Sequence, residues 1–474
     1  MNNEVIMKYK WLPKEERKTM LFLSDDMRIP SGIGTMSREI IEGTCHRYNW
    51  VQLGSAIDHP EHGKILDISE DLSDRTDVKD ASVIIYPYSG YGDQLALRRL
   101  LRDHNPSAIL HFTDPRYWTW LYNMENEIRQ NIPIFFYTIW DDLPYPYYNA
   151  NFYRSCDWLG CISKQTYNIV KQVRAVKEPV EDWQLSYVPH GINPNKYYRV
   201  KEEDEEYEAV VDMKTKLFGD KEYKFVVFYN SRNIRRKMTS DILLAFNQFR
   251  DQLPDDEKDD VALLFHTEPS DEAGTDLRVV HRDLCPDVNL IFTESKFEQD
   301  GINGLYNIVD VTINIASNEG FGLSVAESLM TETPVIVNVT GGLQDQCGFR
   351  DEKGNLLDPD EHYTFDWGSN HDGRYKDHGE WVIPIFPAAI NIVGSPTTPY
   401  IFDDRCTILD AADAIMTWYK RGDEARRKAG VAGKEFCLGE GGLNSDNMCN
   451  LFIENMDRAM TNFKPRQRFF LEAV

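Results

Sequence analysis

The chain has 474 residues, of which 42% are hydrophobic and 27% charged, and its formal net charge at pH 7 is −25. This length exceeds what one ordinary core holds, so two large domains are predicted. Because affinity for a phosphate backbone comes mostly from Lys and Arg, the excess of acid argues against wholesale binding to nucleic acid.

Two sequence features bear on the compartment. No apolar run reaches the length that a membrane-spanning helix needs, so no transmembrane segment is expected. The first 18 residues lack the continuous apolar core of a secretory signal, and the eight cysteines include no C-x-x-C pair. We therefore expect a cytoplasmic protein with reduced thiols and no metal site.

Residues 1–195 are predicted to form an N-terminal domain. Short β-rich runs alternate there with helical or loop stretches, and near-continuous apolar strands are typical of a parallel sheet covered on both faces. The predicted strands are TMLFLS (19–24), NWVQLGS (49–55), SVIIYPYS (82–89), AILHFTD (108–114), IPIFFYTIW (132–140) and DWLGCIS (157–163).

Residues 196–446 repeat this pattern after an acidic run at 202–208. The chain as a whole is therefore predicted to be α/β, with two Rossmann-like, doubly wound domains. A segment at about 345–404 interrupts the second domain and is long for a loop, so short elements of its own or an active-site flap are expected there. Residues 447–474 begin with a helical pattern. The predicted strands are YKFVVFYNS (223–231), VALLFHTEP (261–269), NLIFTES (289–295), VTINIAS (311–317) and TPVIVNVTGG (333–342).

The first predicted strand leads into a glycine-containing loop. Gly32 and Gly34 lie just before a predicted helix, where the missing Cβ atoms and the first helical N–H groups would admit a phosphate. A purely structural turn is the alternative. Asp25 and Asp26 precede the loop, and we interpret them as an ordinary polar strand end in preference to a metal site.

The first strand of the second domain ends in YNSRNIRRKM. Arg232 and Lys237 follow its carboxyl end, where open α/β sheets bind their ligands. A guanidinium fork and a mobile ammonium together suit a diphosphate without a metal. Arg235 and Arg236 are expected simply to face water.

The stretch NEGFGLSVAESLM places Glu319 in a turn and Glu327 on the following helix. The two carboxylates would bracket the helix N-terminus instead of sharing a site. Between them, the N–H groups of Phe321, Gly322 and Leu323 would form an anion-binding nest. Carboxylates on both sides of such a nest suit hydroxyl groups, in the order sugar, diphosphate, ribose.

These motifs resemble those of the retaining glycosyltransferases of family 4, which have the GT-B fold. The E-x7-E spacing of Glu319 and Glu327, the following TPVIV strand and the Gly-Gly loop carry the resemblance in the second domain. The Arg-x4-Lys pair, VPHGIN at 188–193, CISKQT at 161–166 and the loop of Gly32 and Gly34 support it. The resemblance covers both predicted domains in the same order and is looser in the first.

The resemblance implies two domains that face each other across a cleft. The N-terminal domain would bind the acceptor and residues 196–446 the nucleotide sugar, with the helix of residues 447–474 crossing back to the first domain. The donor would be a nucleotide-diphosphate sugar, used as a substrate and not as a cofactor. Transfer would occur with retention and without a metal.

The resemblance also assigns roles to single residues. Glu319 would hold hydroxyls of the donor sugar, the backbone from Gly320 to Leu323 would lie near the sugar and diphosphate, and Glu327 would hold the ribose. Arg232 and Lys237 would neutralise the leaving diphosphate. The expected donor-binding set also includes Gly32 and Gly34.

Two residues depart from the family pattern. Trp140 stands where many relatives have a His near the sugar, and Asp141 follows it as a candidate contact to sugar or acceptor, or as the cap of the next turn. Glu332 replaces the Gly of the family's G-T-P, which we expect to be a surface change.

The acceptor is less well specified by the sequence. A glycan, a lipid-linked molecule or a small molecule is expected, and aromatic residues between 112 and 153 offer either a stacking platform or core packing. Three alternatives stay open: transfer to a hydroxylated base in DNA, which the net charge disfavours; a phosphorylase-like enzyme; and a non-catalytic nucleotide-sugar-binding protein.

Overall fold

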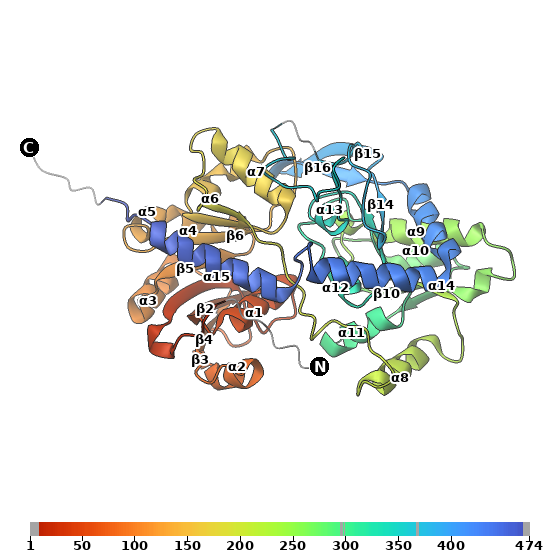
Figure 1. Cartoon of the computed structure of the whole chain (residues 1–474), viewed down its shortest axis with the longest axis horizontal. Helices are drawn as coiled ribbons and strands as arrows, with labels where there is room; N and C mark the ends of the chain where they lie inside the picture. The colour runs from red at the N-terminus through yellow and green to blue at the C-terminus, as the bar shows by residue number, and fades with distance from the viewer. Residues whose placement is uncertain (1–8, 294–296, 298, 366–368, 468–474) are drawn as a thin grey trace, which may run out of the picture. The chain divides into compact units, whose positions relative to one another are not determined.

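The structure is a computed structural model that describes residues 9–293, 297, 299–365 and 369–467 (Figure 1). The chain divides into two compact units. Unit 1 contains residues 1–140, 145–191 and 445–474, and unit 2 contains residues 141–144 and 192–444. The short segment Asp141–Pro144 therefore belongs to unit 2, although unit 1 flanks it in the sequence.

Unit 1 is built on an eight-stranded sheet in the order β3-β4-β2-β1-β5-β6-β7-β8, which is parallel except for the antiparallel pair β3 and β4. Its strands are β1 (Lys18–Asp25), β2 (Tyr48–Ala56), β3 (Leu66–Asp67), β4 (Val83–Ser89), β5 (Ala108–Phe112), β6 (Ile134–Thr138), β7 (Trp158–Cys161) and β8 (Leu185–Tyr187). Its helices are α1 (Gly32–Thr44), α2 (Ser69–Thr76), α3 (Gln94–His104), α4 (Thr119–Asn123), α5 (Glu125–Ile128), α6 (Ala150–Arg154), α7 (Lys164–Ala175) and α15 (Ser445–Asn462). Short 3-10 turns are η1 (Lys14–Glu16), η2 (Pro115–Trp118) and η3 (Tyr147–Asn149).

The central strands of unit 1 are apolar on both faces because helices cover both sides of the sheet. Met20, Leu21, Phe22 and Leu23 of β1 are all fully buried. Helix α15 packs on α1 at a close approach, where a Cβ on Gly43 would lie 2.2 Å from Cys449 Sγ. In Figure 1 the blue helix α15 lies against the red and orange elements of the same unit.

Unit 2 is built on a six-stranded, wholly parallel sheet in the order β11-β10-β9-β12-β13-β14. Its strands are β9 (Phe225–Asn230), β10 (Val261–His266), β11 (Leu290–Phe292), β12 (Val311–Asn314), β13 (Val335–Asn338) and β14 (Val382–Ile385), with a separate hairpin of β15 (Ala389–Ser395) and β16 (Thr398–Arg405). Its helices are α8 (Tyr207–Phe218), α9 (Thr239–Asp251), α10 (Leu277–Leu284), α11 (Gln299–Asn307), α12 (Leu323–Met330), α13 (Leu343–Gln346) and α14 (Ile408–Leu438), with 3-10 turns η4 (Arg235–Lys237) and η5 (Lys258–Asp260). The end of the predicted strand 289–295 lies outside the described residues.

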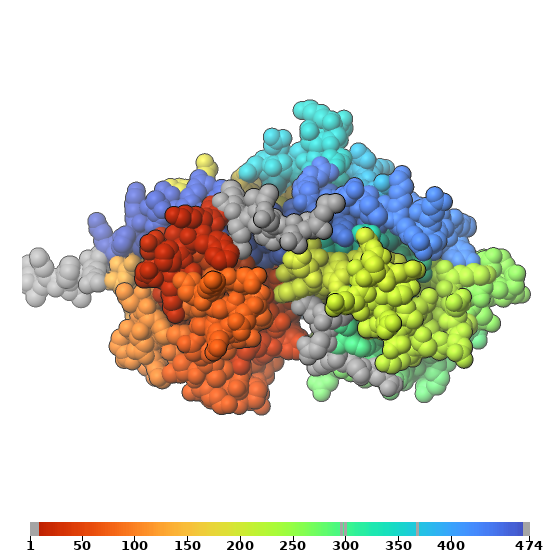
Figure 2. Space-filling view, turned by 60° about the horizontal axis from the view of Figure 1, so that its bottom comes forward, coloured from red at the N-terminus to blue at the C-terminus, as the bar shows by residue number. Residues whose placement is uncertain are grey.

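The α/β prediction with two Rossmann-like sheets is confirmed, and the segment at 345–404 is more integrated than expected. Its β14 pairs with β13 and completes the main sheet, while β15 and β16 form the hairpin. The acidic run at 202–208 and helix α8 lie on the surface, within the yellow-green atoms of Figure 2. Among the described residues, no helix is both long enough and apolar enough to cross a membrane.

Candidate functional site

The turn between β12 and α12 has a backbone that requires glycine. Gly322 is the N-cap of α12, with φ of 90°, and no side chain from the described residues caps the helix. The Gly-Gly loop after β13 packs directly on this turn: a Cβ on Gly342 would lie 2.2 Å from the Gly320 carbonyl oxygen. The first N–H groups of α12 are therefore presented by a closely packed pair of loops at the carboxyl edge of the sheet.

Glu319 lies in this turn and is the centre of an ion cluster. The Lys237 ammonium donates to Glu319 Oε2, and Arg236 Nη1 approaches the same oxygen at 3.1 Å. Arg236 also donates to the Asn318 carbonyl oxygen at 2.6 Å. The sequence placed Glu319 and Lys237 at the same sheet edge, and the structure brings them into contact.

Arg236 was expected to face water and instead belongs to this cluster. Its side chain is 41% exposed, which leaves part of the guanidinium accessible. The only sequence signal was its position beside Lys237. Arg235 is also paired, with Asp403 at 3.3 Å.

The charges in the cluster stabilise one another against burial. Burial alone would raise the pKa of Glu319, but Lys237 and Arg236 outweigh it and hold that pKa below its ordinary value. Burial lowers the pKa of Lys237, against the opposing effect of Glu319. The carboxylate is thus held ionised beside two cations, which is an arrangement suited to polar hydroxyl and phosphate groups.

Glu327 has a separate set of partners. It lies on α12, where Tyr306 donates to its Oε2 at 2.7 Å, and Asn230 Nδ2 in turn donates to the Tyr306 hydroxyl at 3.1 Å. Burial raises the pKa of Glu327, while hydrogen bonds from Tyr306 and Tyr197 oppose the rise. The two glutamates therefore do not share a site, and the sequence offered no signal for either tyrosine.

Arg232 is placed differently from Lys237. Its side chain is 68% exposed and forms a two-pronged contact with Asp271, at 2.7 and 3.2 Å. No contact joins it to Glu319 among the described residues. Because the Arg232 side chain is exposed, water and salt weaken this pair, so Arg232 can exchange Asp271 for another anion.

Asp141 and Asp142 belong to unit 2 and lie beside the Glu319 cluster. A Cβ on Gly341 would lie 3.4 Å from Asp141 Cβ, and Asn318 Nδ2 donates to Asp142. Burial raises the pKa of Asp141 to about 6, with Arg236 opposing the rise and Glu319 adding to it. Burial and the neighbouring Asp141 raise the pKa of Asp142 as well.

The segment at 345–404 supports the site through β16. Ser317 Oγ donates to Asp403 at 2.6 Å, and Thr340 Oγ1 donates to Asp404 at 2.5 Å. These two aspartates thus hold the loops that follow β12 and β13, respectively. His371 Nε2 lies 2.8 Å from the same Asp404 oxygen.

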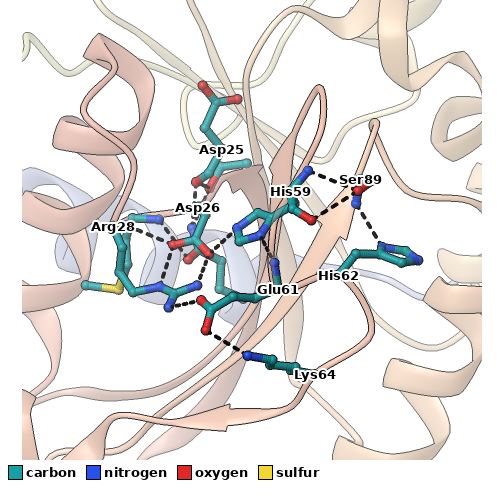
Figure 3. Close-up of polar contacts among 11 residues, drawn as sticks. Asp25, Asp26, Arg28, His59, Glu61, His62, Lys64 and Ser89 are labelled. Carbon is teal, nitrogen blue, oxygen red and sulfur yellow. Dashed lines mark hydrogen bonds and ion pairs between the residues drawn. The ribbon is translucent and has the colours of Figure 1, made fainter.

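In unit 1, the carboxyl end of β1 carries a cluster of charged residues that pair and hydrogen-bond with one another (Figure 3). Asp26 is fully buried and is held by Arg28 at 2.6 Å and by His59 Nε2 at 3.0 Å. His59 Nδ1 accepts from the Glu61 N–H, so both ring nitrogens are engaged and His59 serves to anchor its loop. Asp25 points away from Asp26 in Figure 3. Among the described residues, no three His, Cys, Asp or Glu side chains are placed to hold a metal ion.

The glycines at the start of α1 have a local structural role. Ser31 caps the helix by accepting from the Gly34 N–H at 2.9 Å, and its hydroxyl donates to Asp25. A Cβ on Gly34 would lie 2.4 Å from the Ile29 carbonyl oxygen, so this glycine allows the preceding loop to pack on the helix. Gly32 is the first residue of α1.

Two buried histidines and Trp140 are held within unit 1. His111 Nδ1 pairs with the Tyr122 hydroxyl at 2.7 Å and His190 Nδ1 with the Tyr137 hydroxyl at 2.8 Å; burial lowers the pKa of each histidine to about 3. Both are therefore neutral structural residues. The guanidinium carbon of Arg116 lies 5.5 Å from the centre of the Trp140 ring.

The aromatic residues of unit 1 divide into two groups. Trp118 and Tyr122 are buried and belong to the core. Tyr117 is 57% exposed and stacks on Tyr91, with ring centroids 4.6 Å apart. The pair of Tyr91 and Tyr117 therefore presents an aromatic face of the kind that stacks on a sugar ring, and Tyr147, at 44% exposed, is a further accessible ring.

Comparison with known proteins connects the unit 2 site with a reaction class. Residues 213–368, about a third of the chain, match the family model described as glycosyl transferases group 1. This is a glycosyltransferase domain. It contains the Glu319 cluster, Arg232 and Glu327, and the predicted enzyme class is confirmed. A search of curated proteins found no match to the chain.

Solved structures support the GT-B fold over nearly the whole chain. The chain is similar to HepE of Anabaena in complex with UDP and glucose (12% identity, TM-score 0.61, 93% of this chain and 100% of that chain). It is also similar to sucrose-phosphate synthase of Thermosynechococcus elongatus (14% identity, TM-score 0.62, 94% of this chain and 99% of that chain). A third similar structure is a UDP-forming trehalose-phosphate synthase of Burkholderia vietnamiensis (11% identity, TM-score 0.58, 94% of this chain and 97% of that chain). At these identities the likeness establishes the fold, and the substrate is a separate question.

Proposed function

We propose that the protein transfers a sugar from a nucleotide-diphosphate sugar to an acceptor hydroxyl, with retention at the anomeric carbon and without a metal. The observation that carries the proposal is the ion cluster of Lys237, Arg236 and Glu319 at the uncapped N-terminus of α12. A carboxylate for sugar hydroxyls, two cations and a helix N-terminus for phosphate are thereby gathered at one sheet edge. The UDP complexes of HepE support a donor of this class.

In this proposal, Lys237 and Arg236 stabilise charge that develops on the leaving diphosphate. The bond between the anomeric carbon and the phosphate oxygen breaks, and the acceptor oxygen bonds to the same face of that carbon. The departing phosphate oxygen takes the acceptor proton, so no separate general base is required. Fixed cations in a water-excluded site lower such a barrier by about 3–4 kcal/mol for each donor group.

The nucleotide would extend from this cluster along α12. Glu327, oriented by Tyr306, is proposed to accept from the ribose hydroxyls. Arg232 would leave Asp271 and pair with the diphosphate, which is feasible because the existing pair is exposed. Asp141, whose pKa of about 6 lets it exist in either form near neutral pH, is proposed to contact the sugar or acceptor.

The acceptor is proposed to be a glycan, a lipid-linked molecule or a small molecule, with unit 1 as its binding domain. The exposed stacked pair Tyr91 and Tyr117 supports a sugar-like acceptor. A nucleic-acid acceptor is disfavoured by the net charge of −25. All eight cysteines are unpaired thiols, which supports a reducing cytoplasm as the compartment.

The decisive experiment measures nucleoside diphosphate release from a panel of nucleotide sugars, with and without EDTA. Wild type would be compared with Glu319→Ala and Lys237→Ala. We expect release from one donor that EDTA does not change and that both variants lose. Product configuration, read by NMR, then tests retention. Binding of a donor without turnover, with acceptors supplied, would instead identify a non-catalytic binding protein.

A further inference from the structure

Unit 2 contains a recess at the edge of its sheet opposite the Glu319 cluster. The pocket has a volume of about 330 Å³ and is lined where β12 and β13 begin, at Asp310 and at Thr333 and Pro334. None of its lining residues belongs to the cluster around Glu319. Two valines and the proline form an apolar wall. Three arginines and three carboxylates form the charged part of the lining.

Two of the three arginines of the pocket form ion pairs with its aspartates, and the third does not. Arg426 pairs with Asp310 at 3.0 Å, and Arg427 pairs with Asp423 at 3.1 Å. Arg199 has no carboxylate partner among the described residues. Within the described part of the chain its guanidinium makes one hydrogen bond, from Nη1 to the Asn307 carbonyl oxygen, and this bond is long at 3.4 Å.

Arg199 and Arg427 are the two guanidiniums that a ligand can engage. Burial lowers the pKa of Arg199, and the nearby positive charge of Arg427 lowers it further, against the opposing effect of the pocket carboxylates Glu332, Asp310 and Asp423. The Arg427 pair with Asp423 is exposed on both sides and joins residues four apart on a helix, so it contributes only a few tenths of a kcal/mol. An anion in the pocket would relieve the repulsion between the two guanidiniums.

Each carboxylate of the pocket already has a cation beside it: Asp310 and Asp423 pair with arginines of the same lining, and Glu332 pairs with a lysine outside it. Glu332 pairs with Lys434 at 2.8 Å, and its backbone adopts φ of 62°, in the left-handed region that favours glycine. A non-glycine residue in this region costs about 1 kcal/mol. The backbone is closely packed as well, because a Cβ on Gly430 would lie 1.9 Å from the Glu332 carbonyl oxygen.

We propose that this pocket binds the phosphate group of a small molecule through Arg199 and Arg427. Two guanidinium forks match the charge of a phosphate dianion better than that of a single carboxylate. The volume lies at the lower end of the range for small-molecule sites, and the apolar wall would cover the body of the ligand. The site is separate from the proposed donor site and does not depend on the proposed function.

Hydrogen–deuterium exchange with inorganic phosphate tests the proposal, with chloride at matched ionic strength as the reference. We expect phosphate to protect peptides covering 196–201 and 419–431. Arg199→Gln should weaken the apparent affinity there about ten- to a hundredfold, the loss of one charge-assisted contact. Arg427→Gln, a change at an exposed side chain that leaves folding intact, should weaken it as well.

Two controls separate this site from others. Lys428→Gln removes a neighbouring charge from an exposed side chain of the same helix and should leave protection unchanged. Lys237→Met should abolish phosphate protection at 317–323 without affecting the pocket. Protection that persists in both arginine variants overturns the proposal, as does protection confined to 231–239 and 317–323. Equal protection by acetate would overturn the assignment to phosphate.

Discussion

Replacing Asp141 with Asn should stabilise the protein at neutral and alkaline pH. Burial raises the pKa of this carboxyl from 3.8 to about 6. At 1.36 kcal/mol for each pKa unit, the ionised form costs the folded state about 3 kcal/mol. Because the pKa of Asp141 is higher in the folded than in the unfolded state, this cost is absent below about pH 4. It grows as the pH rises and is complete by about pH 7. Asn has the same shape and never ionises.

The expected gain therefore depends on pH. The variant should exceed wild type in free energy of unfolding by up to about 3 kcal/mol at pH 8 and by only about 1 kcal/mol at pH 4.5. Removing the charge also relieves Asp142, whose pKa is raised by Asp141, so the two effects have the same sign. For a unit of this size, the gain at pH 8 corresponds to a rise in Tm of about 6–12 °C.

Urea unfolding at pH 4.5, 6 and 8, followed by fluorescence and by circular dichroism, measures these differences. Coincident transitions from the two probes justify a two-state treatment. Asp256→Asn, at an exposed position, is the matched control for loss of a carboxyl group. If Asp141→Asn and wild type differ by the same amount at all three pH values, burial does not perturb this carboxyl and the reasoning fails.

Three further outcomes are expected. Lys237→Met should lower kcat about 10²–10³-fold, because it removes a fixed cation beside Glu319. Steady-state kinetics with the identified donor measures kcat, and an unchanged value would remove Lys237 from the mechanism. Gly342→Ala should lower the free energy of unfolding by about 1–3 kcal/mol, because its Cβ would collide with the Gly320 carbonyl oxygen; equal urea midpoints at equal m-values would contradict that packing. Glu332→Gly should be about 1 kcal/mol more stable than Glu332→Ala, since both lose the side chain and only Ala keeps the backbone strain; thermal unfolding that ranks them in reverse order would show that the left-handed backbone is not retained.

Most of the fold was predictable because parallel strands that are covered on both faces read as continuous apolar runs. β9, for example, is buried from Phe225 to Tyr229. β14 escaped prediction because Pro384 stands inside its four residues. A proline is tolerated there because β14 is the last strand of the sheet and one side of its backbone has no partner strand to bond.

The site residues that directly follow neighbouring strands could be predicted from the sequence. Those placed by the conformation of a turn could not. Glu319 and Lys237 are 82 residues apart, but both follow neighbouring strands at the same sheet edge. That Arg236 joins them depends on the 3-10 turn of residues 235–237 and on Met238, whose φ of 55° ends it. Asp142 adjoins Asp141, a candidate contact in the sequence analysis, and Asp403 lies in the 345–404 segment, where an active-site flap was expected. The sequence singled out neither residue itself. The family 4 assignment, retention and the individual residue roles stay predictions.

The segment Asp141–Pro144 has a consequence for the gene. The chain passes between the two units at four peptide bonds, after residues 140, 144, 191 and 444. A truncated clone of 192–444 would lack the tetrapeptide that supplies the partner of Asn318 and the carbonyl oxygen that accepts from the Phe402 N–H. A single recombination event therefore cannot exchange unit 2 cleanly between relatives. A chimaera that is meant to exchange the whole of unit 2 must replace two stretches of coding sequence together.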